Sequence, residues 1–180
     1  MTTPLIREAG PDDLQALLDV NRQAFGSDEE ADLVQKLLRD PSAEPALSLV
    51  AEKDRQLVGH ILFTNARLTP DTPHRMALLA PLSVVPSAQG RGIGGRLIET
   101  GAQILRENGV ELLFVLGHPG YYPRHGFTPA GVFGLQATYP IPEEHADAWM
   151  LRPLKAGIEG SISGRVLCAD TLQDLKYWVE

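Results

Sequence analysis

The chain has 180 residues, of which 43% are hydrophobic, and its formal net charge is −7. Such acidity excludes partners held by phosphate neutralisation along their length, such as duplex nucleic acid or an anionic membrane surface, but not a small anion at a local positive site. The length suffices for one buried core, so we expect a single domain over 1–180, with its core at about 4–130 and a C-terminal extension at about 131–180.

Neither the cysteine usage nor the N-terminal residues indicate export. Cys168 is the only cysteine and cannot form an intrachain disulfide, and MTTPLIREAG lacks the basic, apolar and small-residue order of a signal peptide. No apolar stretch approaches the roughly 20 residues that span a bilayer. We therefore expect a cytoplasmic protein without a transmembrane helix.

A short strand at 4–8 and two helices are predicted at the start of the chain. The sequence Gly10-Pro11-Asp12-Asp13 is typical of a helix start, because proline stands early and two carboxylates lie in the positive first turn. A second helix is predicted to end before Pro41, with three leucines buried: Leu33, Leu37 and Leu38. Because both helices precede the main sheet, we expect them to wall a substrate cleft.

Apolar patterning predicts strands at 46–52, 56–68 and 76–85, and less regular ones at 148–154 and 164–168. The first two strands meet at a tight polar turn, so they form an antiparallel hairpin, and Gly59 marks a bulge in it. Pro81 lies in the middle of the third strand, where it cannot donate a ladder hydrogen bond. We therefore expect a bulge, or a local separation from the neighbouring strand, at Pro81.

The stretch SVVPSAQGRGIGGRLIE, at 83–99, turns an apolar strand through four glycines into an amphipathic helix. The first amides of a helix have no internal partner and the helix dipole adds positive charge, so this turn favours a phosphate or pyrophosphate. The helix is predicted to run to about Asn108 and to lead into a buried strand at Val110–Leu116. A right-handed strand-helix-strand unit makes its two strands parallel, so their C-terminal ends open beside the turn.

Two general phosphate-binding patterns fit this turn poorly. A nucleotide P-loop is excluded, because Arg96 and Leu97 stand where that motif needs Lys and then Ser or Thr. The glycines satisfy the dinucleotide pattern GxGxxG, but no acidic residue ends the next strand to hold a ribose. An NAD(P)-dependent oxidoreductase is therefore kept only as an alternative.

A third pattern fits best. Gln89-Gly90-Arg91-Gly92-Ile93-Gly94 resembles the acetyl-CoA signature Gln/Arg-x-x-Gly-x-Gly/Ala of the GCN5-related N-acetyltransferase (GNAT) family, and Val84-Val85-Pro86 is similar to the family's strand exit. The stretch GHPGYYPRHGF at 117–127 resembles the family's aromatic-Tyr-x-x-x-Gly-Phe motif. Together the two motifs cover about 76–130. By overall look the chain resembles bacterial predicted acetyltransferases that carry a His-Pro-x-Tyr-Tyr sequence.

The resemblance implies an α/β fold whose mixed central sheet is splayed between two parallel strands and flanked by helices. It also implies the transfer of an acetyl group from acetyl-CoA, as cosubstrate, to a primary amine. Because Pro81 loosens its strand, backbone groups around 82–84 become available to pantetheine. The residues expected to bind acetyl-CoA are Leu82, Ser83, Val84, Gln89, Gly90, Arg91, Gly92, Ile93, Gly94, Gly95 and Tyr122.

Two catalytic residues follow from the same resemblance. Tyr122 matches the family's general acid, which protonates the departing thiolate, whereas Tyr121 is expected to pack. Many relatives place a glutamate on the strand that enters the turn, but this chain has Ala80-Pro81-Leu82 there, so that base is not carried over. His118 follows a strand end and is the candidate base, with positioning of the tyrosine loop as its other reading.

The remaining chemistry-bearing residues are expected to be structural. Glu52 and His60 are predicted to face solvent or the core, with the cleft as their other reading. Arg124 and His125 are predicted to lie on the surface, with a place near the CoA ribose phosphate as their other reading. No cluster has metal-ligand spacing. Two tryptophans are expected in the core or in subunit contacts, which keeps a homodimer open: Trp149 and Trp178. The missing glutamate leaves a non-catalytic acyl-CoA-binding module or sensor as an alternative, and the acidity favours a cationic amine as acceptor.

Overall fold

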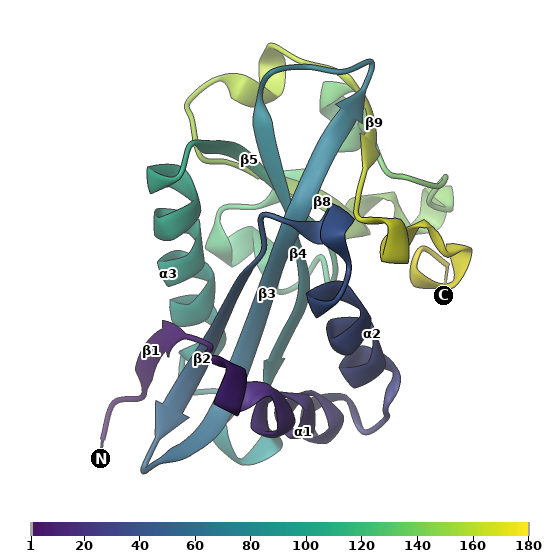
Figure 1. The fold of residues 1–180 in the computed structure, drawn as a ribbon. Helices are drawn as coiled ribbons and strands as arrows, with labels where there is room; N and C mark the ends of the chain where they lie inside the picture. The colour runs from purple at the N-terminus through teal and green to yellow at the C-terminus, as the bar shows by residue number, and fades with distance from the viewer. Residues whose placement is uncertain (1, 180) are drawn as a thin grey trace.

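A mixed sheet runs through the centre of the molecule in the computed structural model, which describes residues 2–179 (Figure 1). Its strands lie in the order β1 (Leu5–Glu8), β2 (Leu47–Lys53), β3 (Gln56–Thr69), β4 (Arg75–Val84), β5 (Val110–Leu116), β8 (Trp149–Pro153) and β6 (Thr128–Pro129). Within this order only β4 and β5 run parallel. Two further strands, β7 (Leu135–Gln136) and β9 (Gly164–Leu167), pair with each other, and β9 joins them to β3. The predicted α/β fold with a mixed sheet is confirmed.

Three α-helices flank the sheet: α1 (Leu14–Phe25), α2 (Glu29–Leu38) and α3 (Ile93–Glu107). Figure 1 shows α3 on one side of the strands and α1 with α2 on the other. The predicted positions of all three helices are confirmed. The predicted burial of Leu38 was wrong. This side chain is 37% exposed, because Leu38 is the last residue of α2 and lies on the outer side of the helix. None of the helices within 2–179 is long and apolar enough to cross a lipid bilayer.

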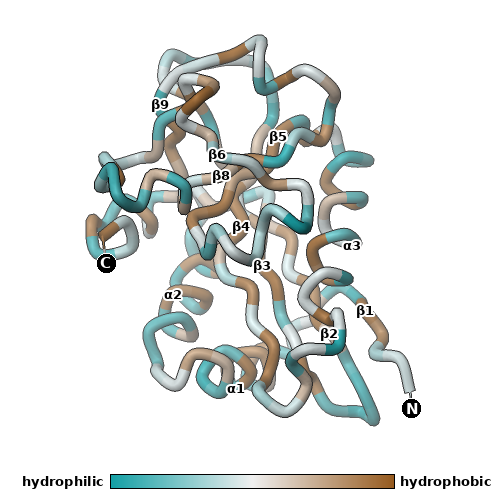
Figure 2. Tube along the Cα trace, turned by 180° about the vertical axis from the view of Figure 1, so that it is seen from behind, coloured by the Kyte–Doolittle hydropathy of each residue, from teal (hydrophilic) through white to brown (hydrophobic). Residues whose placement is uncertain are grey.

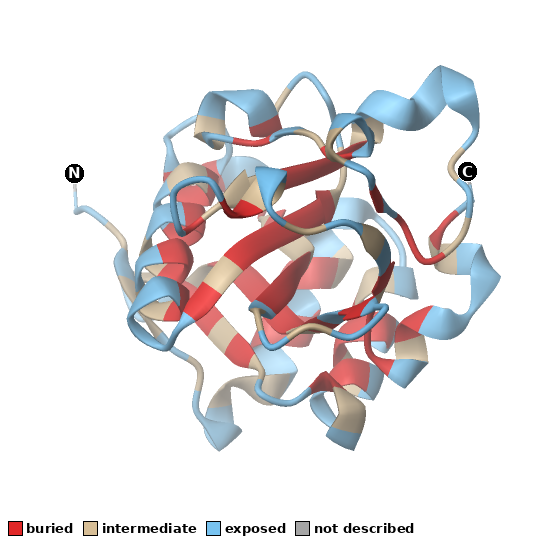
Figure 3. Ribbon diagram, turned by 90° about the horizontal axis from the view of Figure 1, so that it is seen from above, coloured by how far each residue is buried: buried red, intermediate tan, exposed pale blue. Residues whose placement is uncertain are grey.

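The sheet separates two apolar layers, and the alternation of side chains along β3 serves both. Leu62 packs in the layer below α1 and α2, whereas Ile61 and Phe63 pack in the layer below α3. Figure 3, seen from above, shows buried residues along the central strands, and Figure 2 shows hydrophobic stretches along the same strands from behind. Coverage on both faces explains why β5 is a nearly continuous apolar run.

A bulge interrupts the pairing of β3 with β4 at Pro81. Ala80 and Pro81 together stand opposite Leu62, because the flanking pairs are Phe63 with Leu79 and Ile61 with Leu82. Proline has no N–H to give to the ladder, so the extra residue falls where a donor is missing. The bulge predicted at Pro81 is confirmed, as is the one beside Gly59, where the register of β2 and β3 shifts.

The parallel pair β4 and β5 separates at this bulge. Their register runs from Arg75 opposite Val110 to Leu79 opposite Val115 and stops there, although β4 continues to Val84. The second half of β4 therefore keeps β3 on one edge and leaves its other edge unpaired by β5. The predicted splay between two parallel strands is confirmed.

The C-terminal third supplies two strands of the central sheet, β6 and β8, and then returns to α2. β8 pairs with β5 along its whole length, from Leu112 opposite Pro153 to Leu116 opposite Trp149. After β9, residues 170–179 fold back beside α2, as the yellow end of the ribbon shows in Figure 1. The strands predicted at 148–154 and 164–168 are confirmed, with the second one lying outside the central sheet order.

Candidate functional site

A cleft of about 1040 Å³ opens where β4 and β5 separate. Its floor is formed by the ends of these two strands, and one side by the glycine turn and the tyrosine loop at 117–125. The opposite side is formed by α1, α2 and the C-terminal residues, with Phe25, Glu30 and Leu33 among the lining side chains. The prediction that the first two helices wall a cleft is confirmed.

The glycine turn presents backbone donors to this cleft. Gly90 and Gly92 have φ angles of +76° and +79°, a left-handed conformation that glycine adopts without strain. The i to i−4 bond from the Arg96 amide to the Gly92 carbonyl (3.1 Å) starts the helix, so the amides of residues 93–95 precede it and have no acceptor within α3. All three of these residues line the cleft, where free amides and the helix dipole favour an anion.

Gln89 ties the turn to the end of β4. Its Nε2 donates a hydrogen bond of 2.9 Å to the Val84 carbonyl, and both residues line the cleft. On the other edge of the strand, the Val85 amide donates to Val58 of β3 (2.9 Å). Because backbone groups alternate along a strand, Val84 and Leu82 direct theirs away from β3 and towards the cleft.

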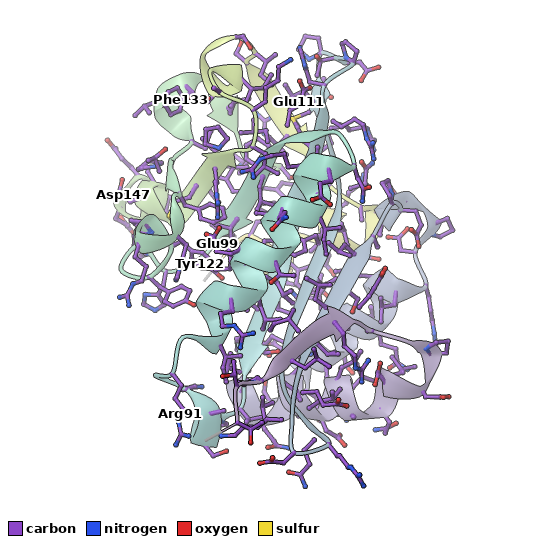
Figure 4. The ribbon with its side chains drawn as sticks, turned by 90° about the vertical axis from the view of Figure 1, so that its left-hand side faces the viewer. Arg91, Glu99, Glu111, Tyr122, Phe133 and Asp147 are labelled. Carbon is purple, nitrogen blue, oxygen red and sulfur yellow. The ribbon has the colours of Figure 1, made fainter. Side chains whose placement is uncertain are left out.

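The predicted acetyl-CoA residues line this cleft, with two exceptions. Ser83 is 2% exposed, and its Oγ donates to the His60 carbonyl (3.4 Å), so its side chain belongs to the core. Arg91 lines an adjoining cavity of about 420 Å³ together with Lys53 and Arg96. Figure 4 shows Arg91 beyond the N-terminal end of α3 and Tyr122 beside the helix. The sequence therefore located the cleft, whereas the structure places these two side chains outside its lining.

A tight loop after β5 holds Tyr122 against the cleft. The His118 carbonyl accepts hydrogen bonds from the amides of Tyr121 (3.0 Å) and Tyr122 (3.2 Å), and a 3₁₀ helix follows at Tyr122–His125. The Tyr122 ring lies so close to Gly117 that a methyl group there would come within 2.5 Å of Cε2. It also meets Phe127 edge-on, with 5.4 Å between ring centroids. Packing on several sides fixes the orientation of this phenol.

Burial determines the proton state of Tyr122, which is only 9% exposed. Loss of solvent raises the pKa of its hydroxyl well above the ordinary range, and the neighbouring Tyr121 adds to the rise. The phenol therefore stays protonated at neutral pH and is available as a hydrogen-bond or proton donor to a group in the cleft.

The side chains of Tyr121 and His125 pack against the first turn of α3. The Tyr121 hydroxyl stands against Gly94, and a methyl group at Gly95 would come within 2.8 Å of His125 Cε1. Both aromatic residues line the cleft, and the Arg124 guanidinium stands over the Tyr121 ring at 5.4 Å. Burial is the main reason that the pKa of His125 is lowered. Tyr121 packs as predicted, but its contact with the glycine turn was missed, because nothing in the local sequence pairs 121 with 94.

His118 combines two features that the sequence left as alternatives. His118 is exposed and lines the cleft, while its backbone carbonyl organises the tyrosine loop. The positioning of the loop therefore uses the main chain of His118 rather than its ring.

Other candidates lie away from the cleft. His60 has no exposed surface, and its ring nitrogens contact Asn21 Nδ2 (3.1 Å) and Ser48 Oγ (2.9 Å). Glu52 forms an ion pair with Arg7 (3.2 Å). The prediction that neither residue serves the cleft is confirmed.

The C-terminal side of the cleft was not anticipated. Leu172, Tyr177 and Trp178 line it, although their short 3₁₀ turns carry no periodicity that a sequence pattern could detect. Both tryptophans belong to the core, as the sequence predicted, being 3% and 4% exposed: Trp149 and Trp178.

Comparisons with known proteins agree with this geometry. Residues 5–130 match the family model described as an acetyltransferase (GNAT) domain. The chain is 52% identical over 161 residues to the uncharacterized N-acetyltransferase YjhQ of Escherichia coli strain K12, covering 88% of both proteins.

Two solved structures share the fold at similar sequence identity. A crystal structure of YhbS, a GNAT family N-acetyltransferase of Escherichia coli in complex with CoA, has a TM-score of 0.87 at 28% identity, covering 96% of this chain and 93% of that one. A GNAT family acetyltransferase of Brucella melitensis in complex with acetyl-CoA has a TM-score of 0.75 at 29% identity, covering 94% of this chain and 97% of that one.

Proposed function

The chain belongs to the GNAT family of acetyl-CoA-dependent N-acetyltransferases, and we propose that it transfers the acetyl group to a primary amine by direct attack, with Tyr122 as general acid. One observation carries the proposal. The cleft brings together the open edge of β4, the free amides at the start of α3 and the buried hydroxyl of Tyr122. These three features suit a thioester, its pyrophosphate and its leaving group, respectively.

The cosubstrate would be held mainly by backbone groups. The amides of residues 93–95 suit the pyrophosphate, because they have no acceptor within α3 and lie at the positive end of the helix. The outward backbone groups of Leu82 suit the amides of pantetheine, since β5 no longer pairs there. The Val84 carbonyl already accepts from Gln89, so Gln89 acts by fixing the strand end.

The chemistry balances with one proton donor and one proton acceptor. The neutral amine nitrogen attacks the thioester carbonyl carbon, the C–N bond forms, and the C–S bond breaks. Tyr122 gives its proton to the departing thiolate, and the proton lost by the amine nitrogen restores the phenol through solvent or a base. A thiol pKa is near 8.5 and that of Tyr122 lies far above it, so the transfer must accompany C–S cleavage.

His118 is our candidate for the base that removes the amine proton. His118 lines the cleft and belongs to the same loop that positions Tyr122. The His118→Gln variant is expected to lower kcat/KM about tenfold or more, with the Kd of acetyl-CoA kept. An unchanged kcat/KM would assign the deprotonation to water.

The Tyr122→Phe variant tests the general acid. Loss of the hydroxyl is expected to lower kcat by about 10²- to 10⁴-fold, while the Kd of acetyl-CoA stays within about twofold of the wild-type value. Isothermal titration gives the Kd, and thiol release gives kcat. The matched control is Tyr121→Phe. The Tyr121 hydroxyl stands against Gly94 in the glycine turn, so its loss should change the Kd of acetyl-CoA. Full turnover by Tyr122→Phe would rule out the assignment.

The same two assays separate the transferase from a sensor. Acetyl-CoA binding without thiol release across a panel of amines would favour a non-catalytic acyl-CoA-binding module. NADPH is the control ligand, because the glycines also satisfy the dinucleotide pattern. A cytoplasmic location and a homodimer stay predictions, which cell fractionation and analytical ultracentrifugation would test.

A further inference from the structure

The cleft continues past the proposed thioester position to a region that we call the distal pocket. Six of the lining residues define it: Phe25, Glu30, Leu33, Leu172, Tyr177 and Trp178. The first three come from α1 and α2, and the others from the C-terminal residues that lie beside α2 in Figure 1. Two parts of the chain that are far apart in sequence therefore face one another across this space.

The distal pocket is apolar and aromatic, with one acidic group. Phe25 keeps 44% of its surface exposed, so it offers apolar surface to a ligand in the pocket. Glu30 is the only carboxylate among the described residues that line the cleft, whereas Arg124, in the tyrosine loop beside the glycine turn, is the only arginine or lysine among them. The charge is thus divided, with the positive end suited to an anionic cosubstrate and the acidic end to a cation.

A hydrogen-bonded junction fixes the C-terminal wall of the distal pocket. Asp40, just after α2, accepts hydrogen bonds on Oδ2 from the Thr171 amide (2.9 Å) and hydroxyl (2.7 Å). Ser42 donates to Asp40 Oδ1 (2.6 Å) and accepts from the Asp170 amide (2.7 Å). Burial alone would raise the pKa of Asp40, but these hydrogen bonds outweigh it and lower the pKa to about 2. The carboxylate therefore stays ionised at any working pH.

An aromatic stack anchors the same wall from the sheet side. Trp178 meets Trp149 edge-on at 5.8 Å between centroids, and Trp149 stacks on Phe114 of β5 at 5.2 Å. The Trp178 Nε1 group also donates to the Leu172 carbonyl (2.6 Å). The wall is therefore preformed in the free protein.

The junction adjoins the distal pocket, because Leu172, which lines the pocket, directly follows Thr171.

We propose that the acceptor is a small primary amine with an aromatic or alkyl body, which packs between Phe25 and Tyr177, and that the negative charge of Glu30 draws the protonated amine into the cleft before its nitrogen is deprotonated at the thioester. The proposal rests on the transferase function given above. In it, Asp40 is a positioning residue that acts through the C-terminal wall, and Tyr177 determines specificity.

A panel of amines tests the choice of substrate. Thiol release is measured from acetyl-CoA with phenethylamine, hexylamine, ethanolamine, spermidine and a short peptide with a free N-terminal alanine. The two apolar amines are expected to give a kcat/KM at least tenfold above the others. Higher efficiency with the peptide or with spermidine would overturn the proposal and leave the transferase function intact. Acetyl-CoA binding without turnover of any amine would instead contradict the function itself.

Two variants test the wall. Tyr177→Ala is expected to lower kcat/KM at least tenfold for phenethylamine and less than threefold for ethanolamine, with the Kd of acetyl-CoA unchanged. Leu175→Ala is the matched control, because Leu175 is 52% exposed and does not line the cleft.

Asp40→Asn is expected to raise KM several-fold when phenethylamine is the acceptor, with kcat largely kept. The wall would be refuted as the specificity determinant by either of two results. One is an Asp40→Asn variant whose kcat falls as much as its KM rises, and the other is a Tyr177→Ala variant whose preference for phenethylamine over ethanolamine is unchanged.

Discussion

Burial sets the proton state of His60, whose ring lies between α1 and the sheet with no exposed surface. Asn21 Nδ2 donates to Nδ1, so the neutral ring carries its proton on Nε2 and donates to Ser48 Oγ. Loss of solvent lowers the pKa of His60 to about 4. A charged imidazolium would lack a carboxylate partner there, so protonation opposes folding.

The resulting prediction concerns acid stability. The unfolded chain takes up a proton at His60 near pH 6.5 and the folded chain only near pH 4, so the stabilisation is complete above pH 6.5 and is lost as the pH falls towards 4. The free energy of unfolding is expected to drop by about 3 kcal/mol over that range. Urea titrations at several pH values measure it.

The control separates His60 from other titrating groups. In His60→Asn most of this pH dependence should disappear, whereas the exposed His145→Asn variant should keep it. His125 contributes in the same direction, because its pKa is also lowered. Asp13 and Asp40, with pKa values of about 2, act only below pH 4. An unaltered slope in His60→Asn would contradict the assignment.

At the scale of elements, the contact of α3 with β3 depends on a missing side chain. Gly101 lies in the middle of α3, directly against the ring of Phe63, which has no exposed surface. A glycine inside a helix normally costs about 0.5–1 kcal/mol relative to alanine. Here the absence of a side chain at Gly101 lets α3 lie close to the sheet. The cost in helix propensity is therefore accompanied by closer packing.

We therefore expect Gly101→Ala to lower the free energy of unfolding by about 1–2 kcal/mol, because overlap with the ring outweighs the gain in helix propensity. A double-mutant cycle with Phe63→Leu checks the cause. In the Phe63→Leu background, where the ring is absent, the same substitution should be neutral or stabilising. The same cost in both backgrounds would place the effect elsewhere.

The elements also show what a sequence can and cannot specify. The glycine turn was predictable because its determinants are local, from the strand exit at Val85 to the helix start at Ile93. Pro81 predicted the bulge and the separation, because a proline removes a backbone hydrogen-bond donor at its own position in the strand. The C-terminal wall was not predictable, because the bonds between Asp40 and Thr171 join residues 131 apart in short irregular turns.

Across the whole molecule, the cleft joins elements from both layers, so a ligand in it should stabilise the entire fold. Acetyl-CoA at 100 times its Kd is expected to add about 2.7 kcal/mol to the free energy of unfolding, which corresponds to roughly 5–10 °C in Tm. Differential scanning calorimetry measures the shift.

Tyr122→Phe should keep this stabilisation in full, because in the proposed mechanism the hydroxyl acts on the reacting sulfur rather than on the parts of acetyl-CoA that provide the binding energy. NADPH at the same concentration should leave Tm unchanged. A shift with NADPH and none with acetyl-CoA would contradict the assigned cosubstrate.

The unpaired edge of β4 has a consequence for solubility. Strand edges with free N–H and C=O groups recruit strands from other molecules, and proteins usually protect such edges at the rim of a sheet. Here the edge lies inside the sheet, because β5 continues the strand order through β8 and β6. Another chain would have to thread between two strands of a folded sheet to reach it. The protein can therefore keep main-chain groups open for a small partner without offering a site for aggregation.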